Sequence, residues 1–148
     1  MTTTMSDRAP EPSPAATPPT PLSIVALDDD ADFREYISAL LASDGHEVRA
    51  VPTPTQVYRA IEADTPDVVL LDMNMGADSG MEVLEQIRSR WPRLCVIVVT
   101  GYPSMDTMRE TFKQDVFDYV TKPFELADIR RVLEDAATQL GLGGKPQD

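Results

Sequence analysis

Cysteine is nearly absent from this sequence, with one residue among 148. A single thiol excludes an intrachain disulfide and any metal site built from several cysteines. Cys95 stands inside the apolar run Leu94–Val99, so we expect it to be a small core residue rather than a reactive thiol. That run is the longest strongly apolar stretch, and it is much too short to cross a bilayer. We therefore expect no membrane-spanning segment.

Basic residues are also few. The chain has 13 Lys and Arg against 25 Asp and Glu, which gives a net charge of −12. Nucleic-acid binding depends on clustered Lys and Arg that neutralise phosphates, so this balance argues against direct DNA binding and against adsorption to an anionic membrane. Hydrophobic residues make up 42% of the chain, which is enough for a core, and the length fits one domain at about 150 residues per domain.

Proline is concentrated at the start of the chain, where six of the thirteen prolines lie within Met1–Pro21 among Ser, Thr and Ala. Such a segment has no apolar face to bury, so we expect residues 1–21 to form a disordered tail; a docking peptide for a proline-recognising partner is the alternative. The segment lacks the basic start and apolar run of a secretory signal, which favours a cytoplasmic protein. Glycines and a proline after Leu140 predict a short flexible tail at 141–148 and leave one domain at 22–140.

Short apolar runs alternate with amphipathic segments between these tails. The runs predict strands at 23–27, 46–51, 67–72, 94–100 and 117–121. Helical segments follow these runs, marked by apolar residues at helical spacing or by start and stop signals such as Thr53-Pro54 and Gly45, and the segment 104–114 is a predicted helix with little apolar surface. Five strands alternating with five helices predict an α/β fold, a doubly wound five-stranded parallel sheet flanked by five helices. Such sheets bind ligands at the carboxyl ends of their strands, where the strand order reverses.

Polar side chains stand at these strand ends. The first strand ends in Asp28-Asp29-Asp30, the third in Asp72, the fourth in Thr100 and the fifth in Thr121-Lys122. Clustered carboxylates repel one another unless a cation compensates them, and oxygen ligands at this density suit Mg²⁺. An aspartate beside a metal and an ammonium can act as a nucleophile towards a phosphoryl group. Aspartates after strands are also common helix caps, the role we expect for Asp30 or Asp32.

Four segments in order resemble the receiver domain of two-component response regulators. They are Ile24–Asp30, Leu70–Met75 with Gly80 eight residues beyond the aspartate, Val98–Tyr102 and Phe117–Phe124. Each motif is weak alone, whereas four at the spacings of the family are specific. The resemblance runs over nearly all of the predicted domain and implies a flavodoxin-like receiver fold.

The resemblance also implies a phosphorylation site. Asp72 matches the phosphoacceptor, which takes a phosphoryl group from a histidine kinase or phosphotransfer protein. Asp28 and Asp29 match the acid pair that holds Mg²⁺, with Asp72 and the backbone carbonyl of Asn74 as the remaining protein ligands.

Three further positions match the residues that read the phosphorylated state. Thr100 matches the hydroxyl that follows the phosphoryl group, and Lys122 matches the ammonium that contacts it. Tyr119 matches the aromatic residue whose rotamer couples to the shift of the threonine, and Pro123 matches a proline preceded by a cis bond. The resemblance places the output face on the fourth helix, the fifth strand and the fifth helix.

Two positions depart from the family pattern. Gly76 stands where the family usually has a proline after the methionine, so we expect a more flexible loop beyond Asp72. Asp115 stands where a glycine usually ends the fourth helix, which carries a cost if the backbone there is left-handed. Outside the motifs, His46 begins an expected edge strand, and we expect it to be a solvated loop residue.

The hypothesis from sequence is a stand-alone response regulator, a switch rather than an enzyme. Its expected outputs are an unidentified partner protein in trans, a phosphorelay step or a phosphorylation-dependent homodimer. One alternative is a phospho-independent pseudo-receiver scaffold, although none of the acids nor the lysine is lost. Another is a Mg²⁺-dependent phosphatase with an aspartyl nucleophile; such enzymes usually carry a second acid two residues after the nucleophile, where this chain has Asn74.

Overall fold

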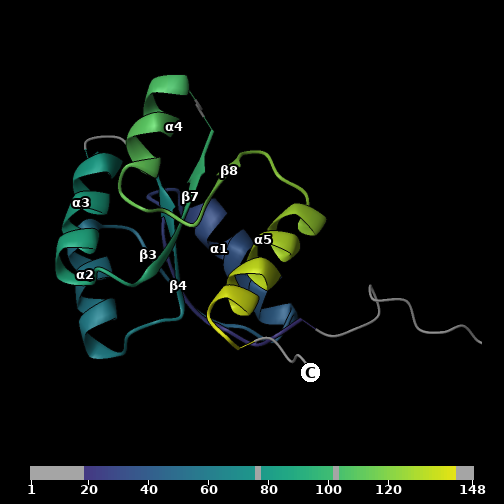
Figure 1. Cartoon of the computed structure of the whole chain (residues 1–148). Helices are drawn as coiled ribbons and strands as arrows, with labels where there is room; N and C mark the ends of the chain where they lie inside the picture. Colours follow the sequence, from purple (N-terminus) through teal and green to yellow (C-terminus); the bar gives the residue numbers. More distant parts are fainter. Residues whose placement is uncertain (1–18, 76–77, 102–103, 143–148) are drawn as a thin grey trace, which may run out of the picture.

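A computed structural model describes residues 19–75, 78–101 and 104–142, with residues 75, 78 and 79 described by their backbone alone. Its centre is a five-stranded parallel sheet in the order β3-β2-β4-β7-β8 (Figure 1). The strands are β2 (Ser23–Leu27), β3 (Glu47–Val51), β4 (Val68–Asp72), β7 (Cys95–Thr100) and β8 (Asp118–Thr121). The predicted doubly wound fold is therefore confirmed. Strand order reverses between β2 and β4, so the ends of these two strands form the expected ligand-binding edge.

Five helices cover the two faces of the sheet. They are α1 (Ala31–Ser43), α2 (Pro54–Ala63), α3 (Gly80–Arg90), α4 (Met105–Phe112) and α5 (Leu126–Gln139). Helices α1 and α5 lie on one face, and α2 and α3 lie on the other, with α4 beside them (Figure 1). None of the described helices is both long and apolar enough to cross a membrane.

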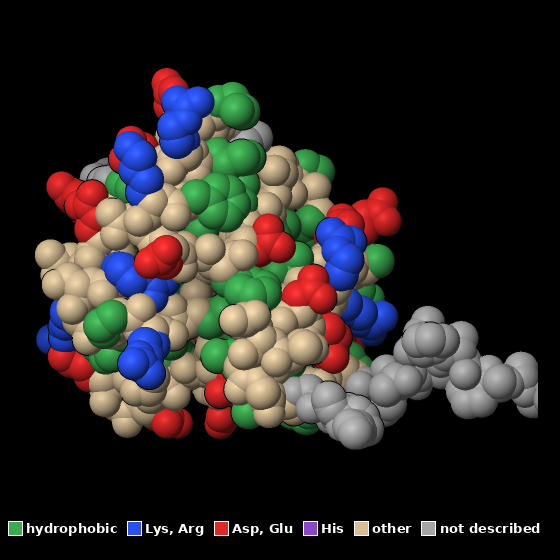
Figure 2. All heavy atoms as spheres, viewed as in Figure 1, with side chains coloured by type: hydrophobic (Ala, Val, Ile, Leu, Met, Phe, Trp, Pro, Cys, Tyr) green, Lys and Arg blue, Asp and Glu red, His purple; other side chains and the backbone are tan. Residues whose placement is uncertain are grey.

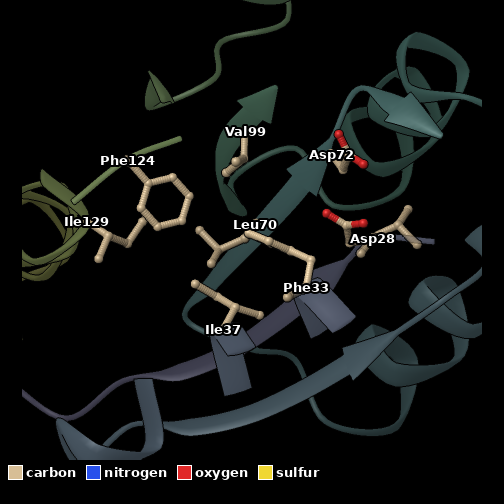
Figure 3. A pocket seen from close by; sticks show the side chains of 10 residues that line it. Asp28, Phe33, Ile37, Leu70, Asp72, Val99, Phe124 and Ile129 are labelled. Carbon is tan, nitrogen blue, oxygen red and sulfur yellow. The ribbon is translucent and has the colours of Figure 1, made fainter. Parts of the chain in front are cut away.

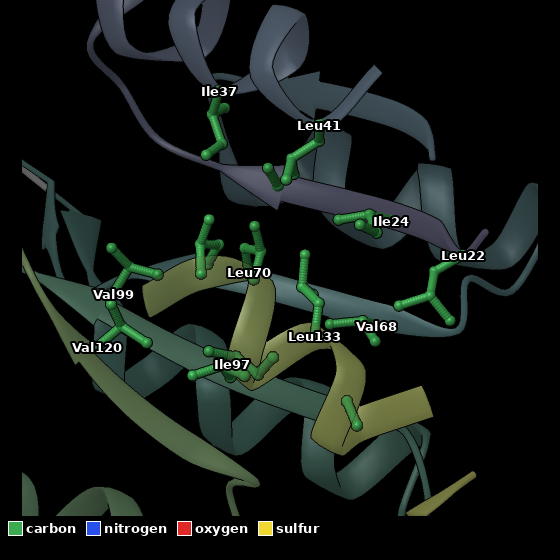
Figure 4. Close-up of a cluster of buried hydrophobic side chains, with 14 of the residues drawn as sticks. Leu22, Ile24, Ile37, Leu41, Val68, Leu70, Ile97, Val99, Val120 and Leu133 are labelled. Atoms are coloured by element: carbon green, nitrogen blue, oxygen red, sulfur yellow. The ribbon is translucent and has the colours of Figure 1, made fainter. Parts of the chain in front are cut away.

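The sheet separates two apolar clusters. The cluster under α1 and α5 includes Ile37, Leu70 and Leu133, whose side chains converge from the two helices and the sheet (Figure 4). The cluster on the other face joins Ile61 of α2 and Ile87 of α3 to the sheet. All five residues of β4 are buried, as expected for a strand covered on both faces, whereas the edge strand β3 is only partly buried.

Helix ends follow the local signals in the sequence. Asp30 caps α1 by accepting from the N–H groups of Asp32 and Phe33, and Thr53 caps α2 with Pro54 in the first turn. Gly45 has φ +91°, which agrees with the predicted stop after α1. These helix ends are set by residues close in sequence, so the capping residues and the glycine were sufficient to predict them.

Helix α4 is attached more loosely than the others. Its one buried side chain is that of Thr111, while Met105 and Phe112 are exposed. Figure 2 shows apolar side chains gathered over α4 beside Lys and Arg side chains. Asp115, just beyond α4, has φ +58°, the left-handed conformation expected where the family has glycine.

Two features differ from the expectation. His46 is buried rather than solvated, because its Nδ1 accepts a hydrogen bond from the Leu22 N–H at 3.0 Å. A two-stranded antiparallel hairpin, β5 (Asn74–Met75) and β6 (Asp78–Ser79), follows β4 and was not predicted. The expected loop flexibility at Gly76 and most of both expected tails, residues 1–18 and 143–148, fall outside the described residues.

Candidate functional site

Three carboxylates meet at the edge where strand order reverses. Leu27 of β2 pairs with Leu71 of β4. The next residue on each strand, Asp28 and Asp72, therefore lies at the same level on two neighbouring strands. One carboxylate oxygen from each of Asp28, Asp29 and Asp72 lies within 4.8 Å of the others. Asp28 and Asp72 are 2% and 4% exposed, whereas Asp29 is open to solvent. Figure 3 shows Asp28 and Asp72 side by side above an apolar cavity.

Lys122 reaches this cluster from the far edge of the sheet. It follows β8, and β7 and β4 lie between β8 and β2. Its Nζ lies 2.6 Å from Asp28 Oδ2 and 3.8 Å from Asp72 Oδ2. A cis bond joins Lys122 to Pro123, and the Lys122 N–H donates to the Thr100 carbonyl at 2.7 Å. The ammonium therefore lies against both buried carboxylates.

Backbone N–H groups hold the other oxygen of each buried acid. Asp28 Oδ1 accepts from the Asp30 N–H at 2.9 Å, and Asp72 Oδ1 accepts from the Asn74 N–H at 3.0 Å. Both carboxylates thus present Oδ2 to the lysine and are oriented by the loop that follows their own strand. These loops contain the Asp30 cap and the β5 hairpin, so local chain geometry sets the orientation of each of these two carboxylates.

Asp72 bears a charge that its surroundings disfavour. Burial, the largest cause, and the nearby charges of Asp28 and Asp29 together raise the pKa of Asp72 to about 6, against the Asn74 N–H and the Lys122 ammonium, which lower it. The Lys122 ammonium pairs with two of these three carboxylates, those of Asp28 and Asp72. Carboxylate oxygens at this spacing, only partly compensated, are the donor set that a hard divalent cation such as Mg²⁺ prefers.

Thr100 and Tyr119 lie on β7 and β8, the two strands beyond β4 in the sheet. Thr100 is fully buried at the end of β7, and its hydroxyl donates to the side-chain Oδ1 of Asn74. Tyr119 pairs in register with Val98 and packs its ring 6.4 Å from that of Phe112 in α4. Burial raises the pKa of the Tyr119 hydroxyl. Thr100 therefore contacts the loop after Asp72, whereas Tyr119 contacts α4.

Gly80 explains one part of the motif. A Cβ at this position would lie 2.6 Å from the Met73 Cα, a distance that a side chain cannot adopt without moving the backbone. The start of α3 can approach the residue after Asp72 only because residue 80 has no side chain.

Sequence reasoning missed two side chains in this region. Asn74 was predicted for its backbone carbonyl, and its side chain also pairs with Thr100. The ring of Phe33 also has its centroid 3.9 Å from Lys122 Nζ. Neither contact has a local signal, because each joins residues far apart in the chain.

These features define a class of protein, the phosphoryl-accepting α/β domains. Such a domain carries clustered aspartates, a lysine and a buried threonine at the edge of a parallel sheet where the strand order reverses. The family model of the response regulator receiver domain matches residues 24–134, and the chain belongs to this family. Receiver domains are the phosphoacceptor switches of two-component systems; they bind Mg²⁺ at an acidic pocket and accept a phosphoryl group from a histidine kinase or another phosphodonor.

Relatives agree with this assignment. The chain is 33% identical over 110 residues to the DNA-binding transcriptional regulator NtrC of Escherichia coli K12, covering 74% of this chain and 24% of that protein. It is 32% identical over 123 residues to the response regulator protein FleR of Pseudomonas aeruginosa, covering 83% and 25%. The chain therefore spans about a quarter of the length of the curated relatives that it matches.

Solved structures give the same result. A response regulator receiver domain protein from Clostridium thermocellum superposes with a TM-score of 0.75 at 30% identity, covering 81% of this chain and 97% of that chain. A CheY-like receiver domain protein from Methanospirillum hungatei superposes with a TM-score of 0.74 at 25% identity, covering 82% and 98%. The described fold is thus that of a receiver domain.

Proposed function

We propose that this chain is the receiver of a two-component phosphorelay and accepts a phosphoryl group on Asp72. The observation that carries this proposal is the meeting of Asp28, Asp29 and Asp72 within 4.8 Å beside the Lys122 ammonium. We assign the receiver unit to residues 22–140, and the donor to a histidine kinase or a phosphotransfer protein in the cytoplasm.

The acid cluster would hold Mg²⁺. Its ligands would be the carboxylates of Asp28, Asp29 and Asp72 and the backbone carbonyl of Asn74, and the ion would supply positive charge to the transferring phosphoryl group. The raised pKa of Asp72 supports this assignment, since a divalent cation would compensate both the burial of its charge and the repulsion from Asp28 and Asp29 that raise it.

The side chains around Asp72 fit the chemistry of phosphoryl transfer. A carboxylate oxygen of Asp72 forms a bond to phosphorus, while the P–N bond of the phosphohistidine breaks and its electron pair leaves with the imidazole. Lys122, which already lies 3.8 Å from Asp72 Oδ2, would contact the new phosphoryl oxygens. The Thr100 hydroxyl would exchange its Asn74 partner for a phosphoryl oxygen.

The movement of Thr100 would then reach the surface through Tyr119 and α4. Tyr119 packs on Phe112, and α4 is weakly buried, so this helix can shift at low cost. The output would be phosphorylation-dependent contact with a partner protein, through the face formed by α4, β8 and α5. A homodimer through this face would be a second form of the same output.

Labelling with acetyl phosphate tests the proposal. Purified wild-type protein incubated with acetyl phosphate and Mg²⁺ should gain the mass of one phosphoryl group, and Asp72→Asn should gain none. The matched control is Asp64→Asn, which removes an exposed carboxylate after α2, at the opposite end of the sheet from the acid cluster; it should be labelled like the wild type.

The alternatives give different results in the same experiment. A folded wild-type protein that remains unlabelled by acetyl phosphate and by a panel of histidine kinases would overturn the proposal in favour of a phospho-independent scaffold. Continuous release of phosphate from phosphate monoesters, with Asp72 required for turnover, would instead indicate a phosphatase.

A further inference from the structure

An aromatic ring faces the lysine of the site. The Phe33 ring, half-buried on the first turn of α1, has its centroid 3.9 Å from Lys122 Nζ, well within the distance at which a cation is attracted to the face of a ring. We propose that Phe33 is a positioning residue that holds the Lys122 ammonium beside Asp72. This inference rests on the proposed function, because it assigns a role in the same phosphoryl-accepting site.

The Phe33 ring is fixed by its neighbours. Phe124 meets it edge-on, with centroids 6.1 Å apart and planes at 89°, and Tyr36 lies one helical turn away at 6.1 Å and 49°. The Asp30 cap also accepts from the Phe33 N–H, so the backbone that carries the ring is held at the start of α1. A ring held on two sides and through its backbone provides a fixed surface for a flexible lysine.

The ring also separates charge from the apolar interior. Phe33, Phe124 and Ile129 line the cavity beneath Asp28 and Asp72 (Figure 3). The Lys122 ammonium lies against the Phe33 ring on one side and the carboxylates of Asp28 and Asp72 on the other, with 23% of its side chain exposed. Without the ring, the four-carbon side chain of Lys122 would have more conformations available away from Asp72.

The ring and the carboxylates hold Lys122 in different ways. Asp28, at 2.6 Å, is an ion-pair partner that other cations bound at the acid cluster would share. The face of Phe33 attracts the ammonium without using any carboxylate oxygen, so this contact persists when the charges of the cluster change. Phe33 would therefore keep Lys122 within reach of Asp72 when Asp28 is otherwise engaged.

Two measurements on a graded series test this role. The series replaces Phe33 by 4-fluoro- and pentafluorophenylalanine, which keep a ring of similar size while weakening the negative face, and by leucine in Phe33→Leu. The control is Phe117→Leu, the same change at another half-buried phenylalanine that packs on the α1/α5 side of the core. NMR of the Lys122 ε-methylene group reports ring contact directly, and the rate of labelling by acetyl phosphate reports function.

We expect the ε-methylene resonances of Lys122 to be shifted upfield by the ring in the wild type and to lose this shift in Phe33→Leu. Labelling should slow progressively along the fluorinated series and fall about three- to fivefold in Phe33→Leu, the range of a partly exposed cation–π contact. Phe117→Leu should change neither measurement.

Three results would overturn the inference. They are an unshifted Lys122 methylene in the wild type, a shift that persists in Phe33→Leu, and a pentafluorophenylalanine variant that labels at the wild-type rate. The fluorinated variants keep the test valid if Phe33→Leu does not fold. Failure of the wild type to be labelled at all would refute the proposed function instead, while the NMR measurement would still decide whether the ring holds the ammonium.

Discussion

Replacing Asp72 by asparagine should make the folded protein more stable in the absence of divalent cations. The substitution removes one of three clustered carboxylates, and an asparagine Oδ1 can still accept the hydrogen bond from the Asn74 N–H. The residue is 4% exposed, so its charge is poorly solvated, and the single ammonium of Lys122 is closer to Asp28 than to Asp72. The neutral side chain should therefore suit this position better.

The size of the effect follows from the pKa. Burial together with the other two carboxylates raises the pKa of Asp72 from 3.8 to about 6. A difference of about two pKa units corresponds to an upper bound of about 3 kcal/mol for holding this group ionised in the folded state. We therefore expect Asp72→Asn to raise the free energy of unfolding by about 2–3 kcal/mol where the wild-type carboxylate is fully ionised.

The stability gained by Asp72→Asn should decrease as the pH falls. The folded state binds the Asp72 proton more tightly than the unfolded state does, because its pKa is raised on folding. The wild type therefore gains stability relative to the variant as pH falls through about 6 towards 3.8. The difference in unfolding free energy should be largest above about pH 7 and should close in mild acid.

Urea unfolding in EDTA measures this difference directly, at about pH 7.5 and at lower values that span the titration. Asp64→Asn is the control, since loss of an exposed carboxylate should change stability by about 0.5 kcal/mol or less. Added Mg²⁺ should stabilise the wild type more than Asp72→Asn. The reasoning is refuted if Asp72→Asn is no more stable than the wild type in EDTA, or if the difference between them does not change with pH.

Other changes test the packing around the site. Gly80→Ala should lower the free energy of unfolding by about 1–3 kcal/mol in urea, since its Cβ would meet the Met73 Cα at 2.6 Å; wild-type stability would contradict this. Asp115→Gly should be neutral or stabilising by up to about 1 kcal/mol, because glycine relieves φ +58° but adds entropy to the unfolded chain; clear destabilisation would show that the Asp115 side chain matters more than its backbone. Burial lowers the pKa of His46, so the wild type should lose stability as pH falls below about 6.5. His46→Gln should remove that part of the pH dependence, and parallel profiles of unfolding free energy against pH for the two proteins would refute this.

Local patterns in the sequence predicted most of the elements. The run Val68–Leu71 between two acids predicts a strand buried on both faces, and β4 is buried along its whole length. Thr53 and Gly45 mark helix ends through contacts within a few residues. These signals succeed because they depend on hydrophobic periodicity and on backbone hydrogen bonds between near neighbours.

Other features had no local signal. His46 is buried against Leu22, whose N–H it accepts a hydrogen bond from and which lies just before β2, far away in the sequence. The β5 hairpin is only two residues per strand, too short for a periodic pattern. A solvated histidine was the wrong prediction because residue type and position at an edge strand do not reveal which distant N–H needs an acceptor.

For the site, the sequence by itself determined which residue types stand at the strand ends, because the end of an apolar run can be located from the chain alone. Only the tertiary structure decided how those residues meet. The distance between Lys122 and Asp28, the ring of Phe33 against the ammonium and the raised pKa of Asp72 all depend on burial and on contacts between elements far apart in the chain. Strand order and helix packing create these contacts, and no short stretch of sequence contains them.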